Sequence, residues 1–112
     1  MVSSSYIPDR GDYVWLNFTL QSGHEQRGVR PAIVISRKEY NEKTGLALCC
    51  PITSKIKGYP FEVAVNSNSV KGVVLSDQIR NLDWKARQAE KIDQADSKVI
   101  DKVIQNLELL IA

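Results

Sequence analysis

Short apolar stretches, separated by polar turn residues, dominate the hydrophobic pattern of this chain. Residues 13–18 alternate and are rich in aromatic and branched side chains, whereas residues 31–36 are continuously apolar, as in a strand buried on both faces. Turn-forming sequences set off three further predicted strands at 46–52, 61–65 and 72–79. Five such strands predict a small β-barrel.

Two segments have a helical pattern. Residues 37–45 contain helix formers and end on Gly45, which predicts one or two helical turns between strands. A longer helix follows Asp96, a suitable N-cap, because apolar residues then recur every three or four positions. These residues are Val99, Ile100, Val103, Ile104, Leu107, Leu110 and Ile111. The predicted fold class is mainly β (α+β): a barrel of about five to seven strands with a short helix between strands and a C-terminal amphipathic helix, which packs on the barrel or on a second subunit.

Length and composition predict one ordinary globular domain over residues 1–112, built around one core. The hydrophobic share is 43%, the charged share is 25% and the net charge is +2. The N-terminus lacks the apolar run of a signal peptide, and the longest apolar run, LALCCPI, is too short to cross a bilayer. We therefore expect a cytoplasmic protein that does not bind a membrane.

The cysteine and histidine content argues against metal or redox chemistry. Cys49 and Cys50 are adjacent in a predicted strand, so their side chains should point to opposite faces as small core residues. His24 is the single histidine, and no His/Cys cluster has zinc spacing. No glycine-rich phosphate loop precedes a helix. We predict neither a metal site nor a cofactor.

Polar side chains gather just before the apolar strand at 31–36. Arginine presents a planar fork of donors that suits a phosphate, and a threonine hydroxyl can donate to another phosphate oxygen. Each residue alone also has a plainer interpretation: Arg30 could pair with Glu25 on the surface, and Thr53 could be a turn residue. The candidate residues are His24, Glu25, Gln26, Arg27 and Arg30 in this loop, and Thr53 and Ser54 at the end of the third strand.

Basic residues lie in or beside predicted loops, so a polyanion could be bound locally. Charge alone is equally consistent with a scattered solvated surface. The residues are Arg27, Arg30, Arg37, Lys38, Lys55, Lys57, Arg80, Lys85, Arg87 and Lys91.

Several segments together resemble the MazF/PemK (Kid) toxins of bacterial toxin–antitoxin modules. They are RGDYVWLNF, GHEQRGVRPAIVIS, YN, PITS, GYPFEV and GVVLSDQIR, which occur in the family's order and spacing over nearly the whole chain. The resemblance implies an SH3-like barrel with a C-terminal helix, and a homodimer that cuts single-stranded RNA without a metal. It also implies a cognate antitoxin that lays an acidic, extended tail across the RNA groove.

The same resemblance implies roles for individual residues. Arg30 and Thr53 match the pair that holds the scissile phosphate, and Glu25 matches an acidic residue implicated in activity, which we assign as general base. The first loop reads TLQ at 19–21, where the family often has DPT. The residues expected to bind RNA are His24, Gln26, Arg27, Ser54, Lys55, Lys57, Asp77, Gln78 and Arg80.

The implied reaction is transesterification. The ribose 2′-hydroxyl attacks its own phosphate and gives a 2′,3′-cyclic phosphate and a free 5′-hydroxyl, while Arg30 and Thr53 stabilise the charge on the phosphoryl oxygens.

Two other functions fit a small barrel of this kind. CcdB-like toxins bind gyrase and rely on a tryptophan close to the C-terminus, whereas this chain has Trp15 and Trp84 and ends in LELLIA. A non-catalytic single-strand-binding barrel stacks bases on exposed aromatic residues, of which this chain offers few at 7%.

Overall fold

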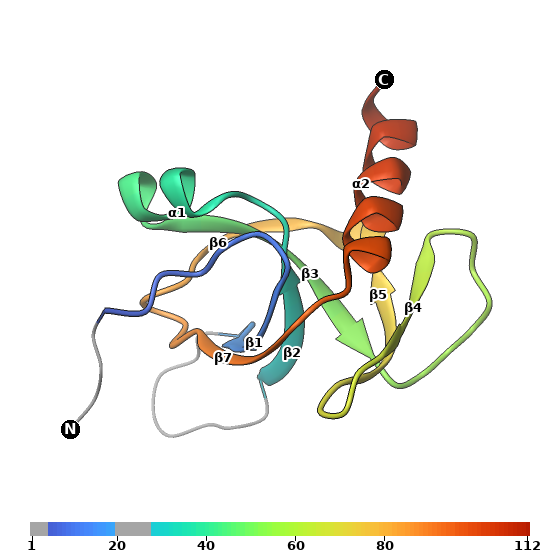
Figure 1. Cartoon of the computed structure of the whole chain (residues 1–112), viewed down its shortest axis with the longest axis horizontal. Coiled ribbons are helices and arrows are strands. Elements are labelled where there is room, and N and C mark those ends of the chain that lie inside the picture. Colours follow the sequence, from blue (N-terminus) through green and yellow to red (C-terminus); the bar gives the residue numbers. More distant parts are fainter. Residues whose placement is uncertain (1–4, 20–27) are drawn as a thin grey trace.

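The computed structural model describes residues 5–19 and 28–112 (Figure 1). Within them, seven strands form one antiparallel sheet and two α-helices flank it. The strands are β1 (Asp12–Asn17), β2 (Val29–Val34), β3 (Leu46–Thr53), β4 (Glu62–Asn66), β5 (Lys71–Leu75), β6 (Arg80–Asp83) and β7 (Glu90–Gln94). The helices are α1 (Lys38–Thr44), α2 (Ser97–Ile111) and a short 3₁₀ helix, η1 (Ser76–Gln78).

Strand β3 is the central element of the sheet. It pairs with β2 along one edge and with both β5 and β6 along the other, while β1 lies between β2 and β7. The turn between β6 and β7 is tied to the end of β1, because Arg87 Nη1 donates to the carbonyls of Asn17 and Phe18 at 3.1 and 2.8 Å. The sheet therefore curls into a half-barrel, which confirms the predicted SH3-like architecture and strand number.

Two hydrophobic clusters, rather than the single core predicted, lie on opposite faces of the central strands. The barrel cluster is Val14, Leu16, Ala32, Val34, Ala47, Cys49 and Leu82. The helix cluster, against which α2 packs, includes Tyr13, Ile33, Ile35, Cys50, Ile52, Val74 and Val103. Alternation along β2 and β3 sends successive apolar residues into different clusters, so these strands need apolar residues on both faces.

The sequence pattern located the first four strands to within one or two residues, but it placed the end of the fifth, predicted at 72–79, four residues too far along the chain. That segment ends as a strand at Leu75, turns through η1, and resumes as β6 at Arg80. Ser76 is fully buried in the turn, where its hydroxyl accepts a hydrogen bond from Asn106 Nδ2 of α2 at 3.3 Å. The turn within this β-type sequence thus lies where the chain contacts the distant helix α2.

Both predicted helices are present. Gly45 closes α1 in the left-handed conformation, at φ 73°. Asp96 caps α2 by accepting a hydrogen bond from the Lys98 amide at 3.0 Å. The apolar stripe of α2 packs against the sheet as far as Leu107, and the helix then continues beyond the sheet with exposed apolar residues (Figure 1). No helix within the described ranges is long and apolar enough to span a membrane.

Candidate functional site

Arg30 and Thr53 lie on neighbouring strands, β2 and β3. The β2–β3 register places Ala32 opposite Pro51, and two residues further along the same register bring Arg30 opposite Thr53. Alternation puts Arg30 on the face of Ala32, and Thr53 on the face of Cys49, so both project from the barrel-cluster side of the sheet. Two residues that are far apart in sequence thus become neighbours at one rim of the barrel.

The backbone around Thr53 is fixed by its neighbours. Thr53 pairs with Val73 of β5, and the adjacent Gly72 has φ 126°, a conformation that favours glycine. A Cβ at Gly72 would stand 2.2 Å from the Thr53 carbonyl oxygen, so only glycine allows β5 this close. The Lys55 amide donates to Thr53 Oγ1 at 3.1 Å, which occupies an acceptor site and leaves the hydroxyl proton available to a ligand.

A pocket of about 280 Å³ contains both residues. Three cationic side chains, those of Arg30, Lys55 and Lys71, line it, and no carboxylate does. In the residues that the structure describes, none of these three cations forms a salt bridge with a carboxylate. Such a pocket can bind an anion the size of a phosphate, with a guanidinium fork and a hydroxyl as donors. Its lining is Arg30, Pro31, Ile52, Thr53, Ser54, Lys55 and Lys71.

The other predicted RNA-binding residues lie outside this pocket's lining. The Lys57 ammonium is 5.8 Å from the ring centroid of Tyr59 in the β3–β4 loop, and the Arg80 guanidinium is equally far from the ring of Phe18. Asp77 and Gln78 are exposed on η1. His24, Glu25, Gln26 and Arg27 fall outside the described residues.

The two cysteines point to opposite faces, as predicted: Cys49 belongs to the barrel cluster and Cys50 to the helix cluster. Burial raises the pKa of each thiol to about 12, so neither is a nucleophile at neutral pH. Among the described residues, no group of three or more His, Cys, Asp or Glu side chains could hold a metal ion.

Comparison with known proteins identifies the family. Residues 9–111 match the model of the PemK-like, MazF-like toxin of type II toxin–antitoxin systems. The chain belongs to this family. It is 49% identical over 88 residues to the endoribonuclease toxin MazF of Escherichia coli K12, with 79% of each chain covered. The endoribonuclease toxin ChpB of the same strain is 35% identical over 109 residues, covering 92% of this chain and 93% of that protein.

Solved structures of MazF proteins have the same fold. A crystal structure of MazF from Deinococcus radiodurans superposes with a TM-score of 0.86 at 51% identity, covering 96% of this chain and 98% of that one. A MazE–MazF complex from the same organism also superposes at 0.86, with 46% identity and the same coverage.

In this MazF-like chain, sequence reasoning did not select Lys71 as a site residue. Lys71 begins β5 directly after the NSNSV turn, so its local sequence resembles any solvated strand end. It joins the pocket because β5 pairs with β3 at Thr53. Lys71 could have been selected only from knowledge that β5 pairs with the end of β3. One sequence does not reveal which strands pair.

Proposed function

We propose that this chain is a single-domain toxin, spanning residues 1–112, that cleaves single-stranded RNA in the cytoplasm. The observation that carries the proposal is the pocket that Arg30 and Thr53 line together with two lysines and no carboxylate. The family match and the relatives named endoribonucleases support the same reaction. No other function is favoured by an observation of this site.

The proposed mechanism uses the RNA's own 2′-hydroxyl as nucleophile. Its oxygen bonds to the adjacent phosphorus as the bond to the 5′-oxygen breaks, giving a 2′,3′-cyclic phosphate and, once the leaving oxygen takes up a proton, a 5′-hydroxyl. Negative charge develops on the non-bridging oxygens, where the Arg30 fork and the Thr53 hydroxyl donate hydrogen bonds. Lys55 and Lys71 add positive potential along the strand.

Residues outside the described ranges have proposed roles as well. Glu25 is the proposed general base for the 2′-hydroxyl, and His24, Gln26 and Arg27 are proposed to bind RNA beside it. Ser54, Lys57, Asp77, Gln78 and Arg80 are proposed to contact RNA from the described part of the chain. Proton transfer and phosphate stabilisation are supplied by side chains, so the mechanism involves no metal or cofactor.

The proposed partners are a second copy of this chain and a cognate antitoxin with an acidic, extended tail. The basic pocket supports the second proposal, because carboxylates of such a tail would occupy the sites of RNA phosphates. The relative solved as a MazE–MazF complex supports it further.

The deciding experiment compares RNA cleavage by Arg30→Ala, Thr53→Ala and wild-type protein in EDTA. Losing one donor to a transition-state phosphate should lower the rate by roughly a hundred- to a thousandfold for Arg30→Ala. Thr53→Ala should lose less, because a neutral hydroxyl stabilises charge more weakly than a guanidinium does. Arg37→Ala is the matched control, since Arg37 is exposed beyond the opposite end of β2 and should leave the rate unchanged.

The products test the chemistry independently. The wild-type 5′ fragment should end in a 2′,3′-cyclic phosphate, and a 2′-deoxy substitution at the cut site should abolish cleavage. Efficient cutting of the deoxy substrate, or full activity of a folded Arg30→Ala protein, would contradict the mechanism. RNA binding with no cleavage by the wild type would instead indicate a non-catalytic barrel.

A further inference from the structure

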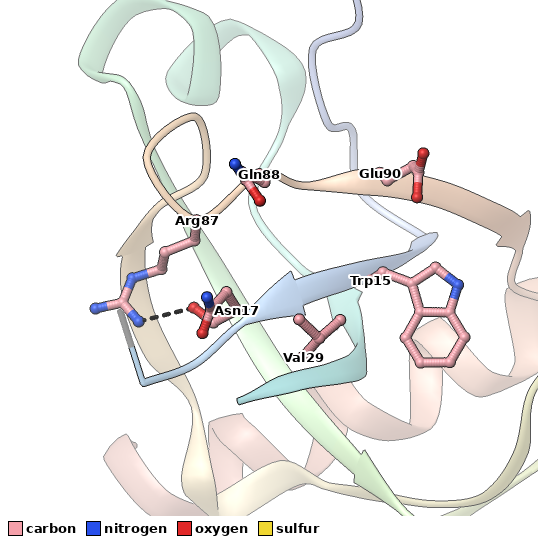
Figure 2. Close-up of a pocket in the computed structure, with 6 residues that line it drawn as sticks. All are labelled: Trp15, Asn17, Val29, Arg87, Gln88 and Glu90. Atoms are coloured by element: carbon pink, nitrogen blue, oxygen red, sulfur yellow. Dashed lines mark hydrogen bonds between the residues drawn. The ribbon is translucent and has the colours of Figure 1, made fainter. Parts of the chain in front are cut away.

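A second pocket, of about 380 Å³, surrounds the exposed face of Trp15 (Figure 2). Its residues come from β1, the start of β2, and the segment that leads into β7. The volume is within the range of roughly 300–1,000 Å³ that is typical of small-molecule sites. The lining is Trp15, Asn17, Val29, Arg87, Gln88 and Glu90.

Trp15 is central to this pocket. In the strand registers it stands opposite Pro31 on one side and Glu90 on the other, so the three side chains share one face of the sheet. That face is the one opposite to Arg30. The Trp15 side chain is 41% exposed, which leaves part of the indole open to a planar ligand.

Pro31 connects the two pockets. It lines the pocket of Arg30 and Thr53, and it is the cross-strand neighbour of Trp15. Because Arg30 and Trp15 face opposite sides of the sheet, a ligand that places a phosphate against Arg30 has to cross the sheet at Pro31 to bring its next group to the indole of Trp15. A nucleic acid strand offers both groups, because each nucleotide carries a charged phosphate and a flat base.

The wall opposite the indole is held rigidly. Arg87 Nη1 donates to the Asn17 carbonyl (Figure 2) and to the Phe18 carbonyl, and the Asn17 amide donates to the Arg87 carbonyl at 3.0 Å. The next residue, Gln88, has φ 58°, the one left-handed conformation of a non-glycine residue in the described ranges. Such a conformation costs a non-glycine residue roughly 1–3 kcal/mol, and here it belongs to the hydrogen-bonded turn that leads into β7.

The polar groups in this wall suit a base with an amino group. Within the part of the chain that the structure describes, the side chains of Gln88 and Glu90 form no hydrogen bond or salt bridge. A carboxylate accepts from the exocyclic amino group of a base, and a glutamine amide can both donate and accept. Uracil has no exocyclic amino group to offer.

We propose that this pocket binds one base of the RNA substrate, stacked on Trp15, and that Glu90 and Gln88 select a base with an exocyclic amino group over uracil. This inference rests on the proposed RNA cleavage. It assigns specificity to a surface distinct from the phosphate pocket. An acidic peptide fits less well, because its carboxylates would face Glu90.

The first test measures binding without cleavage. Heteronuclear NMR of the wild-type protein should show the Trp15 indole N–H signal shifting saturably with adenosine or cytidine, and less with uridine. Trp84 is the internal control, because its Nε1 donates to the Asn41 carbonyl at 2.9 Å and lies away from this pocket. Nucleosides that move neither signal, or both equally, would overturn the proposal.

The second test measures specificity. Once the cut site is mapped, replacing an amino-bearing base beside it with uracil should lower kcat/KM at one position by roughly five- to a hundredfold. The ratio of kcat/KM for the original substrate to kcat/KM for the uracil substrate measures this preference. Glu90→Gln should lower the ratio, and Trp15→Ala should bring it close to one. Trp15→Phe should keep most of the preference, because a phenyl ring still stacks on a base. Glu108→Gln, on an exposed site of α2, is the matched charge control.

The two tests separate this proposal from the proposed function. Cleavage that depends on Arg30 but shows the same base preference in Trp15→Ala would refute the base pocket alone. Nucleoside binding at Trp15 in a protein that never cuts RNA would support the pocket and refute the endoribonuclease. If an acidic antitoxin peptide, rather than nucleosides, moved the Trp15 signal, the pocket would be a peptide site and the proposal would be wrong.

Discussion

Cys49 and Cys50 are adjacent residues whose side chains are buried in different hydrophobic clusters. Burial raises the pKa of both thiols from 9.0 to about 12, and that of Tyr13 from 10.0 to about 12. The folded state therefore keeps protons that the unfolded chain releases above about pH 9. The stability linked to these groups is fully present below pH 9 and is lost as the pH rises toward 12.

Urea unfolding at neutral pH, at about pH 9 and at about pH 10.5 should show a falling free energy of unfolding above pH 9, by roughly 1–2 kcal/mol per thiol at the highest pH. Cys49→Ala should decline less steeply, because it has one buried thiol fewer, although its stability at neutral pH is lower from lost packing. A free energy of unfolding that stays constant from pH 9 upward would show that the thiols titrate normally.

Among the elements, β5 determines where β3 places Thr53. Gly72→Ala would put a Cβ 2.2 Å from the Thr53 carbonyl oxygen, so the two strands must separate. Gly58 is the matched control: it also has positive φ, at 78°, but no atom lies within 4 Å of its added Cβ. Gly58→Ala should lower the free energy of unfolding by roughly 1–2 kcal/mol, because alanine is strained at positive φ.

Gly72→Ala should cost more stability than the control and should also lower the rate of RNA cleavage, because it displaces a proposed phosphate donor. Urea midpoints and kcat/KM of the two variants provide the comparison. Equal stability and equal activity in both would mean that the close approach of β5 to β3 does not position Thr53.

The sequence pattern predicted those elements whose apolar residues face a cluster. It did not predict β6 or β7. Their sequences, RNLD and EKIDQ, are short and mostly polar, with one apolar residue each. Their strand conformation depends on pairing with β3 and β1, and such pairing cannot be read from local composition. The turn at η1 was missed for a similar reason, since Asn106 is 30 residues from Ser76.

At the scale of the whole molecule, the candidate site depends on strand register. The family resemblance supplied Arg30 and Thr53 as a pair, and in the structure both residues line one pocket. Lys71, Pro31 and the pocket around Trp15 could not be predicted in this way. They become part of a site only when β5 pairs with β3 and β2 pairs with β1.

The exposed end of α2 provides a prediction about assembly. Leu109, Leu110 and Ile111 are 71%, 47% and 85% exposed, so the sheet of one chain does not cover these apolar side chains at the end of the helix. Apolar surface of this kind marks contact sites, and most soluble oligomers are symmetric homodimers. We expect light scattering at micromolar concentration to give twice the 12.6 kDa of one chain.

Leu110→Glu should shift the protein toward the monomer, because dimerisation would then bury an unpaired carboxylate. Lys102→Gln changes the charge by the same amount on an exposed site of the same helix, and it should leave the dimer intact. Since Leu110 does not line the phosphate pocket, a monomeric Leu110→Glu protein that keeps its fold also tests whether one chain suffices for cleavage. A wild-type protein that is monomeric at every concentration, or a Leu110→Glu protein that is as dimeric as Lys102→Gln, would show that the end of α2 is not the contact between two chains.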